Sequence, residues 1–206
     1  MIRRLIIESG GASAAEFALV LPIVLLFFFG ILDVGGYTWA LARGEKATQI
    51  GTRWAVATDM IPSGLSSWKF AVDEATPVPQ GSIVPKAKFP GVQCSSNGTS
   101  VTCTCQGGGT CSFPMTANAT AFNTLVARMQ EIKGGIRAQD VVITYSWSGL
   151  GFSGDPNGPD VAPIVNVAIR NAQFQPISLS PFGGSVPLPS FNYSLTMEDG
   201  SGTYAN

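Results

Sequence analysis

The chain has 206 residues, of which 45% are hydrophobic, only 12% are charged and none is histidine, and its formal net charge is −1. A near-neutral charge argues against a nucleic-acid partner, and the lack of histidine removes the commonest general base and neutral metal ligand. Soluble domains carry about 25% charged residues, so the low charge content favours a chain that enters a membrane or exposes small polar residues.

An apolar run near the N-terminus is the first strong signal. Residues 17–32, FALVLPIVLLFFFGIL, contain no charge, and with their neighbours they reach the roughly 20 residues that a helix needs to cross a bilayer. Arg3 and Arg4 precede the run, and the next basic residue is Arg43. We therefore expect a transmembrane helix over residues 12–33, with a cytoplasmic N-terminus and the rest of the chain outside.

Glu16 opens this run, where a carboxylate is costly unless it is paired. The preceding residues resemble a prepilin-peptidase site, whose pattern is a glycine, the cut, four residues and a glutamate. Cleavage after Gly11 would remove residues 1–11 as a leader and make Ala12 the new N-terminus. Its ammonium would lie about 6 Å along the helix from Glu16, so the two charges would offset each other within one subunit or between neighbours.

Two other interpretations of the N-terminus stay open. An ordinary signal peptidase prefers an Ala-x-Ala site, and residues 40–42 match, but they lie well beyond the apolar run, which is long for a signal peptide. Alternatively, the chain keeps its leader as an uncleaved single-pass anchor, with Glu16 at the lipid headgroups.

The segment that follows predicts a stem helix over residues 34–60. No proline occurs between Asp33 and Asp59. Apolar residues recur there at spacings of three to four, as in an amphipathic helix continuing from the membrane: Leu41, Ala47, Ile50, Trp54 and Ala57. This stripe would pack on the protein's own domain, on other stems, or on both.

The N-terminal segment as a whole carries a family pattern. Small residues lead into Ala-Ala-Glu-Phe-Ala-Leu-Val-Leu-Pro, then an apolar helix, then the acidic Asp33. This segment, from Gly11 to Thr58, resembles the TadE-like family of tight-adherence (Flp) pilus proteins. The resemblance implies a pseudopilin processed by a prepilin peptidase between Gly11 and Ala12.

The resemblance also implies roles and partners. Glu16 and Phe17 would form the assembly signal, and the partners would be the inner-membrane pilus platform, other pilins and the lipid bilayer. Major pilins of this type are very short and typically have Glu-Tyr where this chain has Glu16-Phe17. Both differences indicate a minor subunit.

The rest of the chain, residues 61–206, is expected to be an exported domain with a Cys-rich insert at 93–112. The spacing C-x8-C-x-C-x5-C lacks the CxxC pairs of structural zinc sites. An even number of cysteines in an exported chain favours two disulfides, and three pairings remain open among Cys94, Cys103, Cys105 and Cys111. The Gly/Ser/Thr-rich insert is expected to resist regular structure and to gain order from these cross-links.

Periodicity predicts the elements of this domain. A short helix is suggested over residues 68–75, and a stronger apolar stripe predicts one over 118–133. Alternation with period two predicts three strands, over 141–147, 165–170 and 191–197. We expect a pilin-like α+β fold, in which a long N-terminal transmembrane and stem helix packs on a small antiparallel sheet.

One loop has weak metal-binding character. Asp155, Asn157 and Asp160 offer oxygen ligands for calcium, but the EF-hand pattern and its closing glutamate are missing. Asn-Gly between two prolines favours an ordinary turn.

Catalysis has little support in the sequence. There is no histidine, no GxSxG and no Walker glycine loop, so we predict neither an enzyme nor a cofactor. The predicted function is that of a minor pilin in a tight-adherence pilus for surface attachment. It would lie in the bacterial inner membrane with a periplasmic domain, or in the extracellular pilus. The alternative is a membrane-anchored, exported adhesion or binding module outside any pilus.

Overall fold

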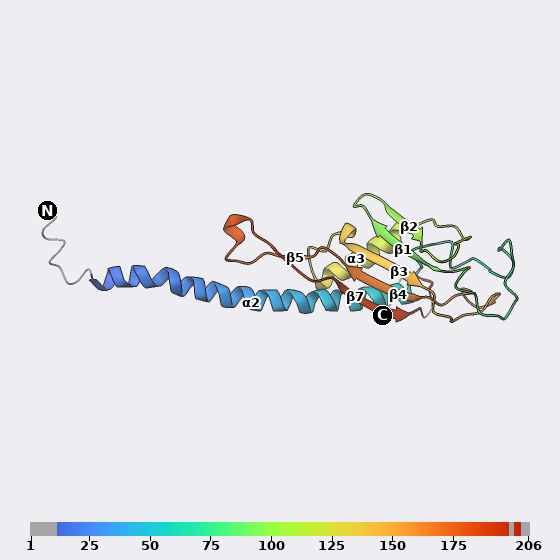
Figure 1. The fold of residues 1–206 in the computed structure, drawn as a ribbon, viewed down its shortest axis with the longest axis horizontal. Coiled ribbons are helices and arrows are strands. Elements are labelled where there is room, and N and C mark those ends of the chain that lie inside the picture. Colours follow the sequence, from blue (N-terminus) through green and yellow to red (C-terminus); the bar gives the residue numbers. More distant parts are fainter. Residues whose placement is uncertain (1–11, 198–199, 203–206) are drawn as a thin grey trace. The chain divides into compact units, whose positions relative to one another are not determined.

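The computed structural model of the chain describes residues 12–197 and 200–202, and they divide into two compact units (Figure 1). The first unit contains the N-terminal helix up to Ala40 together with residues 173–187. The second contains residues 41–172 and the chain from Leu188 onward.

A single helix, α2, runs over Ala12–Ala57, and it contributes to both units. Its 46 residues correspond to about 70 Å. Pro22 is its one internal proline; it lies in the apolar part, where neighbouring groups re-satisfy a freed carbonyl more readily than in water. The long N-terminal helix predicted from hydropathy is therefore confirmed.

The second unit is built on a five-stranded antiparallel sheet with the order β2-β1-β3-β4-β7. Its strands are β1 (Gly91–Ser96), β2 (Val101–Cys105), β3 (Val141–Ser146), β4 (Ile164–Ile169) and β7 (Phe191–Thr196). The three strands predicted from alternation are β3, β4 and β7, side by side in one half of the sheet. The α+β class is confirmed.

Helix α3 (Ala119–Ile132) matches the helix predicted over 118–133. It begins after Asn118, whose side-chain oxygen accepts a hydrogen bond from the Ala121 N–H at 3.0 Å, which satisfies one of the free donors of the first turn. The expected apolar face is buried, with Phe122, Leu125, Val126 and Met129 inside the unit.

The sheet buries one face against helices of the same unit. Alternate residues of the strands are almost fully buried, because successive side chains point to opposite faces: Val92, Cys94, Val141, Ile143, Tyr145, Val165, Val167, Ile169 and Phe191. Two glycines let the backbone of helix α2 lie close to β7 and to α3. A Cβ at Gly44 would lie 2.5 Å from the Phe191 ring, and a Cβ at Gly51 would lie 2.8 Å from Met129.

The helix suggested over residues 68–75 is wrong, because only a single turn forms there. The Val72 and Asp73 amides both donate to the Lys69 carbonyl, at 3.0 and 2.8 Å. The Phe70 N–H is bound instead by the Asp160 carboxylate, at 2.8 Å. Pro77 follows too closely for a longer helix, because the residue before a proline disfavours the helical backbone conformation.

The expectation of an irregular Cys-rich insert is also wrong over much of its length. Strands β1 and β2 form a hairpin in register from Ser96↔Val101 to Val92↔Cys105. Its loop is organised by Asn97, whose side-chain oxygen accepts from the Thr99 and Ser100 amides at 2.9 and 2.8 Å. Gly98 adopts φ +96°, which favours glycine.

In the first unit, residues 173–187 form a second, very small sheet. Strands β5 (Gln173–Phe174) and β6 (Val186–Pro187) pair antiparallel, and a 3₁₀ turn, η3 (Ser180–Phe182), lies between them. None of these short elements has enough residues to show a period in the sequence, and none was predicted.

Candidate functional site

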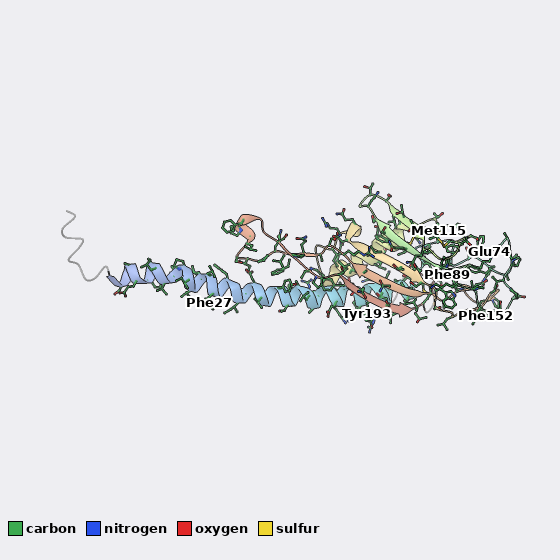
Figure 2. All side chains as sticks on the ribbon, in the orientation of Figure 1. Phe27, Glu74, Phe89, Met115, Phe152 and Tyr193 are labelled. Atoms are coloured by element: carbon green, nitrogen blue, oxygen red, sulfur yellow. A yellow bond between two sulfur atoms is a disulfide. The ribbon has the colours of Figure 1, made fainter. Side chains whose placement is uncertain are left out.

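The apolar part of α2 exposes nearly all its side chains. Phe27, labelled in Figure 2, is 72% exposed, and Phe17 is 65% exposed. The most apolar window of the helix has a mean hydropathy of 2.7 and none of it is buried. By length and composition, this is the one helix among the described residues that is able to cross a membrane. It is consistent with a single-pass anchor.

Three of the predicted processing and assembly residues, Ala12, Glu16 and Phe17, lie in the first turns of this helix. Gly11 is outside the described residues, Ala12 is the first residue of α2, and Glu16 follows one turn later. The Glu16 side chain is exposed, and within the described part of the chain it forms no hydrogen bond or ion pair. A carboxylate here adjoins an uncharged run, so in a low-dielectric setting its charge has to be paired or neutralised.

A second carboxylate of the first unit, Asp33, does have partners. It accepts hydrogen bonds from the Ile177 amide and the Ser178 hydroxyl, and from the Ser178 amide at 3.0 Å. The sequence marked Asp33 as the acid at the end of the apolar helix, but it did not indicate these partners. The only available signal was the cost of a carboxylate at the edge of an apolar run.

The same segment contacts α2 at one more place. The Phe174 ring lies edge-on to Tyr37, with the centroids 5.8 Å apart. A Cβ at Gly36 would come within 3.0 Å of that ring, so the glycine lets the ring lie directly on the helix backbone.

The four cysteines form two disulfides, which resolves the open choice of pairing. Cys94 and Cys103 are cross-strand partners in β1 and β2, with their Cα atoms 4.1 Å apart. Cys105, at the end of β2, pairs with Cys111, with a Cα–Cα distance of 5.9 Å. The first bridge lies on the buried face at Cys94, whereas the second closes a loop at the surface.

The loop with suggested calcium ligands is organised around Asp160, which is fully buried. Its carboxylate accepts hydrogen bonds from the amides of Phe70 (2.8 Å), Gly154 (2.8 Å) and Asp155 (3.2 Å). The Lys69 ammonium lies 3.4 Å from the same carboxylate and donates to the Asp155 and Gly158 carbonyls at 2.5 and 2.8 Å.

A lysine side chain thus supplies the positive charge of this loop. Asn157 has a different role: its amide donates to the Asp155 carboxylate at 2.9 Å, as in an ordinary Asx turn. Across the described residues, no group of three or more His, Cys, Asp or Glu is placed to hold a metal ion.

One further polar group is buried in the core of the second unit. The Tyr145 hydroxyl oxygen accepts a hydrogen bond from the Ile61 amide at 3.1 Å. Burial raises the pKa of Tyr145 well above its usual value, and the bond from Ile61 lowers it by less. The folded state therefore favours the neutral phenol of Tyr145 over its charged form.

Comparison with known proteins finds a family match for the N-terminal part of the chain. Residues 11–53 match the family described as TadE-like protein. Neither the curated proteins nor the solved structures gave a match. The matched segment contains Glu16, Asp33 and most of α2. Residues 11–53 are thus similar to the TadE-like family, the resemblance that the sequence predicted for this segment.

Proposed function

We propose that the protein is a minor subunit of a tight-adherence pilus, a pseudopilin held in the inner membrane by α2. The observation that carries this proposal is the coincidence of two features in one segment. The TadE-like match covers residues 11–53, and the first half of the same segment exposes an apolar helix surface. A family of pilus proteins implies association with other pilus components.

The physical need for a partner supports the same function. Exposed apolar surface costs about 25 cal/mol per Å² in water, and Leu26 and Phe27 are more than 70% exposed on adjacent positions. Lipid covers such a surface before assembly, and neighbouring pilin helices cover it in a filament. A helix that serves in both settings needs apolar residues all round, which is the pattern observed before Asp33.

Glu16 has a defined task in this proposal. A prepilin peptidase cuts after Gly11, and the new ammonium on Ala12 lies about one helical turn, or about 6 Å, from the Glu16 carboxylate. The pair offsets the cost of both charges at the bilayer edge, within one subunit or between an incoming subunit and its neighbour. The second unit, cross-linked by two disulfides, is then the periplasmic head of the subunit.

The mature N-terminus tests the processing step. Intact mass and N-terminal sequencing of membrane-extracted protein should find Ala12 first, and Gly11→Leu should abolish the cut. A chain that begins at Met1 in piliated cells would remove the processing claim.

A pair of variants tests the assembly step. Glu16→Ala should still be processed, but less protein should co-purify with other pilins and less should enter sheared pili. Glu45→Ala is the matched control, because Glu45 is an exposed glutamate of the same helix in the second unit. Normal incorporation of the Glu16 variant would disprove the charge-pair role. Absence of the wild-type chain from both pili and platform would disprove the pilus function itself.

A further inference from the structure

Residues 173–187, which we call the arm, form a hairpin against the helix of the first unit. Strands β5 and β6 close its base, and η3, Ser180–Phe182, lies at its tip. The arm contains no charged side chain. In Figure 1 it is the orange segment that runs alongside α2.

The contacts of the arm define its direction along the helix. Near the base, Phe174 lies against Gly36 and Tyr37. Farther out, the Ile177 and Ser178 amides reach Asp33. From base to tip, the contacts therefore move about one helical turn toward the N-terminus of α2. The tip continues in the direction of the apolar run that ends at Leu32.

The outer part of the arm exposes three large apolar side chains, which alternate with serine, proline and glycine. Ile177 is 55% exposed, Leu179 is 41% exposed and Phe182 is 85% exposed. Ile31 and Val34, on either side of Asp33 in the helix, are exposed as well. Apart from Asp33, whose carboxylate is hydrogen-bonded to the arm, the exposed side chains of helix and arm named here are uncharged and apolar, and exposed apolar side chains that gather in this way mark interaction sites.

Asp33 makes this surface compatible with a membrane boundary. Backbone amides that leave water need an acceptor, and the Asp33 carboxylate accepts from two amides and one hydroxyl of the arm. In turn, three donors surround a carboxylate that would otherwise be costly at the end of an apolar span.

We propose that the tip of the arm, with Leu179 and Phe182, inserts into the interfacial layer of the bilayer that α2 crosses. The protein then holds one membrane leaflet at two points, through the helix and through the arm. This inference rests on the proposed function only in so far as α2 spans a lipid bilayer. Lipid is the partner because the arm runs along α2 toward its apolar part and adds exposed apolar side chains beside the proposed span.

Depth-dependent quenching tests the proposal on the full chain. The protein is reconstituted in vesicles of phosphatidylethanolamine and phosphatidylglycerol that contain lipids brominated either near the headgroup or near the chain end. Phe182→Trp reports on the tip. Val72→Trp is the matched control, because Val72 is an apolar side chain of the second unit that is 77% exposed. The emission of the native tryptophans is subtracted with wild-type protein.

The indole introduced by Phe182→Trp should emit at shorter wavelength than the one introduced by Val72→Trp. Lipid brominated near the headgroup should quench its emission more than lipid brominated near the chain end. Iodide in the aqueous phase should quench it less than the indole introduced by Val72→Trp. Equal quenching of the two introduced indoles by iodide would overturn insertion. Protection of the tip indole from both iodide and brominated lipid would also overturn it, because a protein surface would then cover the tip.

Flotation of the vesicles after an alkaline wash separates this inference from the proposed function. A chain that fails to float has no membrane anchor, and both proposals fall. A chain that floats while the tip indole stays in water retains its anchor and loses only the arm insertion. Asp33→Ala, placed in the Phe182→Trp protein, should abolish the quenching by headgroup-brominated lipid. Unchanged quenching would remove the role of Asp33 in positioning the arm.

Discussion

Replacement of Asp160 by alanine should produce a large loss of stability, because a buried carboxylate organises the loop around it. Three amides donate to it, and Lys69 forms its ion pair. The Phe70 amide is buried and the Gly154 and Asp155 amides are partly buried, and a buried donor left without a partner costs about 1–3 kcal/mol. The Lys69 side chain is 36% exposed, so its ion pair contributes less than the about 3–5 kcal/mol of a fully buried pair. We take about 3–5 kcal/mol for Asp160→Ala, because the three unpaired amides account for most of the loss. This is a large part of the roughly 5–15 kcal/mol typical of a folded protein.

Urea unfolding of the full chain in detergent, followed by tryptophan fluorescence with the disulfides intact, measures this loss. Asp73→Asn is the matched control: Asp73 lies in the same region, its side chain is exposed and it accepts one backbone bond, from Lys69 at 2.8 Å. It should cost less than about 1 kcal/mol. Equal free energies of unfolding for Asp160→Ala and Asp73→Asn would refute the reasoning.

The same measurement distinguishes the lysine from a metal ion in this loop. Because the Lys69 ammonium already contacts Asp160 and two carbonyls, we expect neither calcium nor a chelator to change the unfolding midpoint. A rise of the midpoint with calcium would show that the loop binds the ion despite Lys69.

Three further predictions use the same unfolding assay or direct mapping. Tyr145→Phe leaves the Ile61 amide without its acceptor and should cost about 1–3 kcal/mol at neutral pH. The folded-state pKa of Tyr145 is raised, so its contribution is complete below the unfolded pKa of about 10. It declines above that pH by up to about 1.4 kcal/mol per unit, and identical alkaline slopes in wild type and Phe variant would contradict this. Gly44→Ala should destabilise, because the new methyl meets the Phe191 ring, whereas Gly35→Ala, with nothing within 4 Å, should be neutral or stabilising; a neutral Gly44 variant would show that the ring moves. Peptide mapping without reduction should recover the pairs Cys94–Cys103 and Cys105–Cys111, and a Cys94–Cys111 peptide would disprove this pairing.

Elements with a strong hydrophobic period were predictable from the sequence. Strands β3, β4 and β7 alternate over six residues each, and α3 presents four apolar residues on one face. Strands β1 and β2 were missed because polar and small residues dominate them. In the first, Val92 and Cys94 are the buried members of an alternation that Ser and Gln obscure.

The candidate site was predictable only where a charge interrupts an apolar pattern. Glu16 and Asp33 stand out on that ground, and the role of Glu16 remains a prediction. The partners of Asp33 were not predictable, because they lie 144 and 145 residues away in the sequence. The role of Lys69 was not predictable for a similar reason. Its ammonium binds the Asp155 carbonyl, 86 residues away in the sequence, and no local pattern indicates such a contact.

The bridge between Cys94 and Cys103 has a consequence for when the sheet of the second unit acquires its final strand register. Strand β2 is an outer strand whose side chains are mostly in water, so burial alone specifies its alignment with β1 only weakly. A covalent bond between directly opposed residues excludes a shifted alignment. Thiols stay reduced in the cytoplasm and oxidise in the periplasm. If the second unit is exported, as proposed, this edge of the sheet is therefore fixed in register only after the unit has crossed the membrane.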